Sequence, residues 1–216
     1  MKLTDLRDKL ILDAGCGQGM DGVILSLLRN VVVGVELSRW VAQKAKELAH
    51  EADFEVLVAD IERLPIRAEA FDVVYCGWVL HHFKHIQPAI NELARVLRLK
   101  GNIAIVEPNG SSIAVKLTQL IEGTIRPCLV NMSIDTPNET LHTLTTYIKA
   151  LIYNGFTNFE VHSCYFGEHP PLPHRYRWIF SFVVRIRNLI YGLLIIAARS
   201  PLKGTNLLIM AQKRGK

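Results

Sequence analysis

The sequence has few cysteines and no paired ones. Its 216 residues include four, Cys16, Cys76, Cys128 and Cys164, and none belongs to a Cys-x-x-Cys pair. Widely spaced single cysteines argue against a zinc site and against a disulfide framework. Residues 1–10 (MKLTDLRDKL) also lack the apolar run of a secretory signal. We therefore predict reduced, buried thiols and a cytoplasmic location.

Internal repeats, low-complexity segments and an obvious linker are absent as well. Half of the residues are hydrophobic and 21% are charged, which excludes a disordered or fibrous protein. A chain of this length can bury a core of its own. We predict a single domain over residues 1–216.

Acidic residues are nearly absent from the end of the chain. From Gly167 onward nine Lys and Arg accompany one acid, Glu168, a net charge of +8 against −3 for the first 166 residues. The same stretch is strongly apolar. Basic and apolar composition together favour a membrane surface or a lipophilic anionic ligand over nucleic acid. We predict peripheral membrane contact through residues 174–199, and no nucleic-acid partner.

Within this stretch, Trp178–Ala198 has the length of a transmembrane helix. It carries Arg185, Arg187 and Asn188 near its middle. Each Arg there costs about 2.5–3.5 kcal/mol on insertion scales. Wound as a helix, the segment places its large apolar side chains on one stripe and its polar ones opposite. It is therefore predicted as a packed helix pair or an interfacial helix, not as a membrane span.

In the first half of the chain, short apolar segments alternate with helical patterns. Strands this apolar are buried on both faces, as parallel strands are, and their alternation with helices indicates βαβ units. The predicted strands are Lys9–Asp13, Val31–Val35, Phe54–Val58, Phe71–Cys76 and Asn102–Val106, and the predicted helices are Met20–Arg29, Arg39–His50 and Gln87–Arg98.

The second half of the chain predicts three further elements. Lys100–Gly101 is expected to end the preceding helix with a left-handed glycine cap. Thr136–Glu139 has the pattern of a capping box, predicting a helix that ends near Asn154 before Gly155. Two last strands are expected over Phe159–Phe166 and Asn206–Gln212, with residues 167–205 as an insertion between them.

The strongest site pattern is a glycine loop where the first strand meets the first helix, at residues 12–19 (LDAGCGQG). Open α/β sheets bind ligands at such a junction, and glycines allow the tight turns. The dinucleotide pattern GxGxxG fails, because Met20 stands where its third glycine is required. Asp13 ahead of the glycines would repel a pyrophosphate but would suit an ammonium group.

Two further acids follow the next two strands. Glu36 stands where a carboxylate can accept hydrogen bonds from both ribose hydroxyls. Asp60 ends the third strand, where it can reach an adenine amino group. These acids suit a ligand that has a nucleoside and an amino-acid ammonium group but no phosphate. S-adenosylmethionine (SAM) is such a ligand. The residues therefore predict SAM as the cofactor.

These motifs, in their order, resemble the class I SAM-dependent methyltransferases, and more narrowly the subgroup that includes ubiquinone and menaquinone biosynthesis methyltransferases. The resemblance covers residues 9–109 and rests on LDAGCGQG, GVELS (34–38), ADIERLPI (59–66), FDVVYCGWVLHHF (71–83) and NELARVLRLKGNIAIVEPN (91–109). It implies a Rossmann-like α/β fold with a seven-stranded, mostly parallel sheet, strand order 3-2-1-4-5-7-6, helices on both faces and an antiparallel strand 7.

The resemblance also implies roles for particular residues. Glu36 would hold the ribose, Leu37 would pack on the adenine, and Asp60 with Ile61 would address its edge. Cys76 would offer its backbone to the amino-acid end of the cofactor. The methionine part would be surrounded by Asp13 and the loop residues Gly15, Cys16, Gly17 and Gly19.

Methyl transfer from a sulfonium needs mainly an aligned nucleophile, with a general base where the nucleophile loses a proton. His81 and His82 follow the fourth strand and are candidate bases, although either can equally be a structural histidine bonded to backbone. His81 and His85 can share a helix face, but no acid or cysteine completes a ligand set, so no metal is predicted.

The predicted activity is methyl transfer to a small, lipophilic acceptor. Residues 167–205 are predicted to form a lid over it, since only eight residues precede the first strand. Packing on the sheet, a dimer contact and a truncated start are alternatives for this feature. Two other functions stay open: a non-catalytic SAM-binding partner subunit and, less favoured, a nicotinamide-dependent oxidoreductase.

Overall fold

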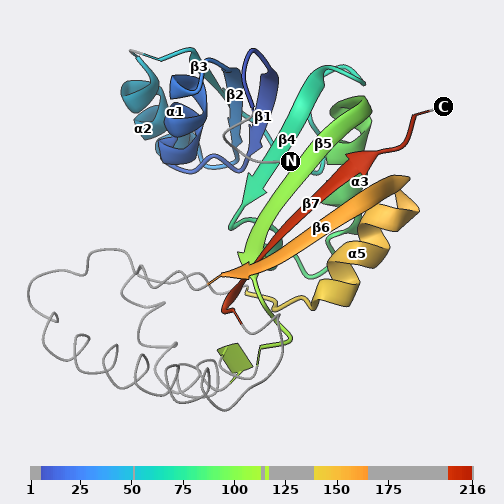
Figure 1. The fold of residues 1–216 in the computed structure, drawn as a ribbon. Helices are drawn as coiled ribbons and strands as arrows, with labels where there is room; N and C mark the ends of the chain where they lie inside the picture. Colours follow the sequence, from blue (N-terminus) through green and yellow to red (C-terminus); the bar gives the residue numbers. More distant parts are fainter. Residues whose placement is uncertain (1–5, 51, 113–114, 117–138, 165–203, 216) are drawn as a thin grey trace, which may run out of the picture.

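The fold is an α/β sheet with helices on both faces (Figure 1). The computed structural model describes residues 6–50, 52–112, 115–116, 139–164 and 204–215. Its strands are β1 (Leu10–Ala14), β2 (Val31–Glu36), β3 (Phe54–Val58), β4 (Phe71–Gly77), β5 (Leu97–Pro108), β6 (Phe156–Cys164) and β7 (Asn206–Lys213). Its helices are α1 (Met20–Leu27), α2 (Arg39–Ala49), the 3-10 turn η2 (Leu80–His82), α3 (Gln87–Val96) and α5 (Leu144–Tyr153).

The seven strands form one sheet in the order β3-β2-β1-β4-β5-β7-β6. The first five are parallel to one another, and β7 pairs antiparallel with both β5 and β6. The predicted fold class and strand order are therefore confirmed. The carboxyl ends of β1, β2, β3 and β4 meet at one edge of the sheet, which gathers the loops that follow them.

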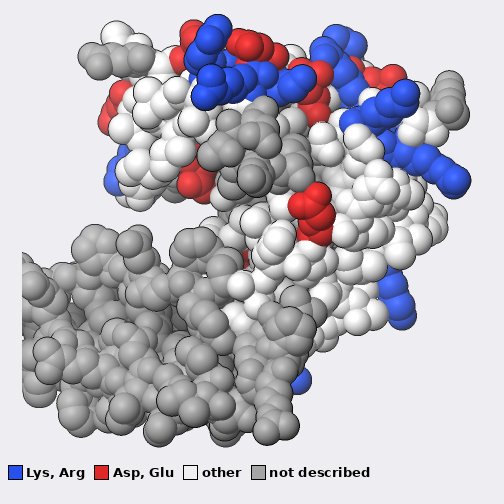
Figure 2. Space-filling view, in the orientation of Figure 1, with Lys and Arg blue, Asp and Glu red and all other residues white. Residues whose placement is uncertain are grey.

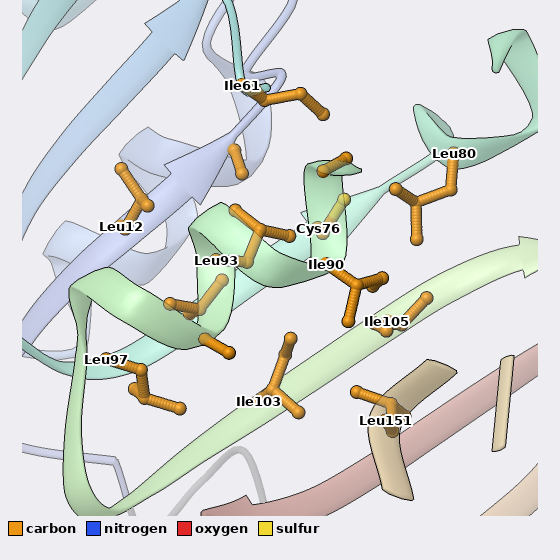
Figure 3. Close-up of a cluster of buried hydrophobic side chains, with 14 of the residues drawn as sticks. Leu12, Ile61, Cys76, Leu80, Ile90, Leu93, Leu97, Ile103, Ile105 and Leu151 are labelled. Carbon is orange, nitrogen blue, oxygen red and sulfur yellow. The ribbon is translucent and has the colours of Figure 1, made fainter. Parts of the chain in front are cut away.

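The central strands β1 and β4 are buried on both faces, because successive side chains point to opposite sides and helices cover each side. Ile11 belongs to the core cluster that includes residues of α1 and α2, whereas Leu12 belongs to the cluster that includes residues of α3 and α5. Val73 and Val74 divide in the same way. Figure 3 shows the second of these clusters, in which Cys76, Leu80, Ile90, Leu93, Ile103 and Ile105 lie together.

The predicted end of α3 is wrong. The helix stops at Val96, and Leu97 already pairs with Phe71 as the first residue of β5. The left-handed residue is Lys100, at φ 62°, and not Gly101. Gly101 is needed for space, since a Cβ there would lie 2.9 Å from the carbonyl oxygens of Arg98 and Asp72.

The predicted start of the next helix is also wrong. Helix α5 begins at Leu144, where Thr143 is the N-cap and accepts a hydrogen bond from the Thr146 amide. The residues before it use their backbone in tertiary contacts: the Thr140 amide donates to the His81 carbonyl oxygen, and the His142 carbonyl oxygen accepts from the Gly110 amide. The predicted stop at Gly155 is confirmed, with φ 76°.

Several predictions fall on other parts of the chain. The insertion at residues 167–205, apart from its last two residues, lies outside the described residues, as do Trp178–Ala198, Cys128 and the Thr136–Asn138 part of the capping box. Within the described ranges, no helix combines the length and the hydropathy that a membrane span requires.

Figure 2 shows that charged side chains gather along the upper edge of the molecule, where the parallel strands begin. The ion pair of Arg98 with Asp72 lies at this end, and Asp72 also accepts a hydrogen bond from the Leu10 amide. Away from this edge, the described surface in this view is mostly uncharged. The amino ends of the strands thus carry structural ion pairs, whereas the glycine loop lies at the opposite ends.

Candidate functional site

The glycine loop between β1 and α1 forms a series of left-handed turns. Gly15, Gly17 and Gly19 have φ values of 79°, 53° and 87°. The amides of Gly15 and Cys16 both donate to the Val35 carbonyl oxygen, which ties the loop to the end of β2. Since side-chain-bearing residues rarely adopt this conformation, all three glycines are needed for the path of the loop.

Two of these glycines also have no room for a side chain. A Cβ on Gly15 would lie 2.2 Å from a methyl carbon of Val79, in the loop after β4. One on Gly19 would lie 2.8 Å from the ring of Phe54. By contrast, a Cβ on Gly17 would meet no atom within 4 Å. The loop is therefore closely packed at its ends and open at Gly17.

Asp13, the last but one residue of β1, is a buried acid with an unused oxygen. The residue is 1% exposed, and its Oδ2 has no hydrogen-bond partner within the described structure. Burial, reinforced by the negative charges of Asp21 and Glu36, raises the pKa of Asp13 to about 8, although a hydrogen bond from the Gly22 amide opposes this. A buried carboxyl with a free oxygen and excess negative charge around it suits a cationic ligand group.

Glu36 is held at the end of β2 by two backbone amides. Its Oε2 accepts a hydrogen bond from Gly17 at 3.1 Å, and its Oε1 accepts from Ser38 at 2.8 Å. A carboxylate offers about four acceptor positions, so each oxygen keeps one for a ligand hydroxyl. The side chain is half-buried beside the open part of the glycine loop.

Leu37 and Asp60 follow the ends of the neighbouring strands β2 and β3. The Glu36 carbonyl oxygen accepts a hydrogen bond from Ala59, which joins the ends of β2 and β3. Asp60 Oδ1 accepts from the Glu62 amide at 2.9 Å, so its carboxylate orientation is set locally. Leu37 is 69% exposed, unlike a core leucine, so its apolar side chain is accessible to a ligand.

Besides Asp13, three predicted cofactor-site residues have buried side chains, namely Cys16, Ile61 and Cys76. Ile61 and Cys76 belong to the core cluster on the α3 side of the sheet (Figure 3), so only their backbone can serve a ligand. Burial raises the pKa of the Cys76 thiol well above its ordinary value. It also raises the pKa of Cys16 to about 12, with Asp13 and Glu36 adding to the effect. Both thiols are therefore neutral near pH 7 and unsuited to act as nucleophiles.

The two candidate bases differ in environment. His81 is buried, and its Nδ1 lies 2.8 Å from Oε2 of Glu107. His82 is exposed, and its ring lies 4.1 Å from that of His81, centroid to centroid. His85 is exposed, and no group of three metal-ligating side chains occurs in the described ranges.

Glu107 is not among the site residues predicted from the sequence. This residue of β5 is fully buried and is the acceptor for His81. A signal was present, because an acid within an otherwise apolar strand (NIAIVEP) needs a buried partner. A second contact that the sequence did not indicate is the hydrogen bond that the Tyr75 hydroxyl donates to Asp21 Oδ2 at 3.0 Å, which joins β4 to the start of α1.

Comparison with known proteins agrees with this geometry. The sequence profile described as a methyltransferase domain matches residues 12–105, from the end of β1 into β5. This segment is similar to the methyltransferase-domain family. The match includes the glycine loop, Glu36, Asp60 and the loop after β4, and the family resemblance seen in the sequence is confirmed.

Several methyltransferases are similar to this chain. An uncharacterized methyltransferase of Bacillus subtilis, YcgJ, is 29% identical over 100 residues, 45% of this chain and 40% of that protein. The 27-O-demethylrifamycin SV methyltransferase of Amycolatopsis mediterranei is 34% identical over 44% of this chain and 37% of its own length. The crystal structure of YcgJ matches with a TM-score of 0.67 and 19% identity, covering 99% of this chain and 95% of that one.

The similarity to curated relatives is thus confined to part of each protein. The chain spans about 40% of the length of these two relatives. Their names favour an enzyme over the partner-subunit and oxidoreductase alternatives.

Proposed function

We propose that this methyltransferase domain transfers a methyl group from SAM to a small acceptor. The observation that carries the proposal is Asp13, a buried carboxyl with an unpartnered oxygen at the glycine loop. SAM bears an ammonium and a sulfonium and has no phosphate, so its positive charge favours the ionised form of Asp13 and is attracted by the carboxylates of Asp13 and Glu36. The same carboxylates would repel the pyrophosphate of a nicotinamide dinucleotide.

Each residue of the site has a proposed role. Asp13 would pair with the ammonium, and Glu36 would accept hydrogen bonds from the two ribose hydroxyls. The exposed Leu37 would pack on the adenine, whose edge would face Asp60 and the backbone of Ile61. The backbone of the glycine loop (Gly15, Cys16, Gly17 and Gly19) and of Cys76 would enclose the methionine part.

The bound cofactor supplies an activated methyl group, so the protein acts mainly by orienting the acceptor and excluding water. Such positioning can contribute about 7–11 kcal/mol. Where the acceptor loses a proton, His81 or His82 is the proposed base. Because His81 Nδ1 faces Glu107, the proton would be taken by its Nε2.

The acceptor is proposed to be small and lipophilic. The support is compositional: residues 167–205 are apolar and basic and precede β7 in the chain. We propose that they form a lid within one domain, residues 1–216, and that residues 174–199 touch a membrane from the cytoplasmic side. Co-sedimentation with vesicles containing anionic lipid is expected; its absence, at low salt, would contradict the membrane contact.

The cofactor is tested by calorimetric titration with SAM, S-adenosylhomocysteine (SAH) and NAD. Micromolar binding of the first two and none of NAD is expected. Glu36→Ala should weaken SAH binding at least about tenfold, because each hydrogen bond to a charged group contributes about 1.5–3 kcal/mol. The matched control is Glu55→Ala, which removes an exposed acid of β3 and should leave affinity unchanged. A folded protein that binds NAD, or neither SAM nor SAH, would contradict the proposal.

A further inference from the structure

Trp78, directly after β4, has an unfavourable backbone conformation. Its φ is 60°, in the left-handed region that bulky residues rarely occupy. Its amide donates to the Val106 carbonyl oxygen at 2.8 Å, so the turn begins while the chain is still paired with β5. A strained residue persists only where its surroundings hold it. The chain that follows Trp78 must therefore be fixed by strong contacts.

Those contacts converge on Glu107. One carboxylate oxygen, Oε1, accepts hydrogen bonds from Val79 at 2.7 Å and from Leu80 at 2.6 Å. The other, Oε2, accepts from the His81 amide at 3.3 Å and lies 2.8 Å from its ring Nδ1. Three consecutive amides directed at one fully buried carboxylate form an anion-binding turn that the protein fills with its own side chain.

The same turn touches the glycine loop. Val79 is the residue whose methyl carbon occupies the space beside Gly15, where a Cβ would lie 2.2 Å away. Val79 is thus fixed on one side by Glu107 through its amide and packs on the other side against the loop through its side chain. A shift of this turn would change the shape of the loop beside Asp13.

We propose that Glu107 is a positioning residue of the cofactor site. By binding the amides of residues 79–81, its carboxylate holds Val79 against Gly15 and keeps the glycine loop in its binding conformation. It also orients His81, whose Nδ1–H donates to the carboxylate and whose Nε2 then faces away from it. This inference rests on the proposed function, since it concerns SAM affinity at the same loop.

The test compares SAH binding by calorimetry in Glu107→Ala, Glu107→Gln and the wild type. Glu107→Ala leaves three amides, two of them in buried hydrogen bonds, without their acceptor and should weaken SAH binding about tenfold or more. Glu107→Gln keeps one acceptor oxygen and should recover most of the affinity, while its amide group donates to His81 Nδ1. The His81 ring should then change tautomer, which ¹⁵N nuclear magnetic resonance of the histidine side chains detects.

A matched control separates positioning from general stability. Leu151→Ala opens a cavity in the same core cluster on α5, lowers the melting temperature and should leave SAH affinity unchanged at 15–20 °C below that temperature. Should Glu107→Ala fail to fold, Val79→Ala tests the same contact, since it retains the amide that Glu107 binds. It is expected to weaken SAH binding several-fold.

The outcomes are distinguishable. A wild-type protein that binds no SAH contradicts the proposed function. A wild type that binds SAH, together with folded Glu107→Ala and Val79→Ala variants of equal affinity, overturns the positioning role alone. Equal weakening in Leu151→Ala overturns it as well, because the effect would then follow stability.

Discussion

Replacing Asp13 by asparagine should weaken SAM binding at least about 30-fold while leaving the fold intact. Removing one partner of a buried charge pair costs about 2–5 kcal/mol, and asparagine keeps the shape of the carboxyl without its charge. Calorimetric titration of both proteins at pH 8 measures the loss. Ser26→Ala, which alters another buried polar side chain that bonds only within α1, is the control and should bind SAM normally. Equal affinity of Asp13→Asn and the wild type would contradict the role of Asp13.

The same substitution should change how stability depends on pH. The pKa of Asp13 is raised from an ordinary 3.8 to about 8 in the folded protein, so the folded state binds the proton more tightly than the unfolded state. Stability of the ligand-free protein should therefore fall as pH rises from about 4 to about 8, by a total on the order of 5 kcal/mol from this group.

Denaturant unfolding of the ligand-free proteins at several pH values checks this expectation. Asp13→Asn cannot titrate, so its stability should decline less between pH 5 and pH 8, and at pH 8 it should exceed that of the wild type. SAM binding should also release a proton from Asp13 below pH 8, which titration in buffers of different ionisation enthalpy detects. Identical pH profiles for the two proteins would exclude a raised pKa at Asp13.

Gly15→Ala should be far more damaging than Gly17→Ala, although both add one methyl group to the same loop. Both residues have positive φ, which costs about 1–2 kcal/mol for alanine. At Gly15 the new Cβ would also overlap a Val79 methyl carbon at 2.2 Å, and overpacking adds about 1–3 kcal/mol. We expect a loss of about 2–5 kcal/mol of unfolding free energy at Gly15 and of about 1–2 kcal/mol at Gly17, together with loss of SAH binding in Gly15→Ala.

A double substitution tests the cause. Val79→Ala removes both methyl carbons that the Gly15 Cβ would meet and leaves the next atom at 3.1 Å. The double variant Gly15→Ala, Val79→Ala should therefore be more stable than the sum of the two single effects predicts, by about 1 kcal/mol or more. Additive effects would mean that backbone conformation, and not the contact with Val79, makes Gly15 necessary.

The strand order was predicted from the resemblance to a known family, whereas the alternating strands and helices and the glycine loop were predicted from the residues themselves. These last features depend on local patterns: β-branched apolar strands such as Val31–Glu36, a helix after each of them, and glycines with an acid ahead of them. Such patterns act over a few residues, and the motifs from residue 12 to residue 105 occur in the order of a known family. Asp13, Glu36 and Asp60 could be predicted as site residues because each stands at or just after the end of such a strand.

The boundaries that failed were decided by contacts distant in sequence. Helix α3 ends at Val96 because Leu97 pairs with Phe71, and the chain before Leu144 stays non-helical where Thr140 and His142 bond to the loops after β4 and β5. A capping pattern favours the start of a helix by only about 1 kcal/mol. A few tertiary hydrogen bonds together contribute more than this and can keep the chain non-helical.

Only the tertiary structure determined how the site is held together. The sequence contains Gly15, Val79 and Glu107 but does not show how they are related. In the structure the Glu107 carboxylate accepts hydrogen bonds from the amides of residues 79–81, and the Val79 side chain fills the space beside Gly15. The sequence also shows that Asp13 is an acid, but not that burial leaves one of its oxygens unpartnered and raises its pKa. Burial and long-range contacts depend on how the whole sheet packs, so neither can be predicted from local sequence patterns.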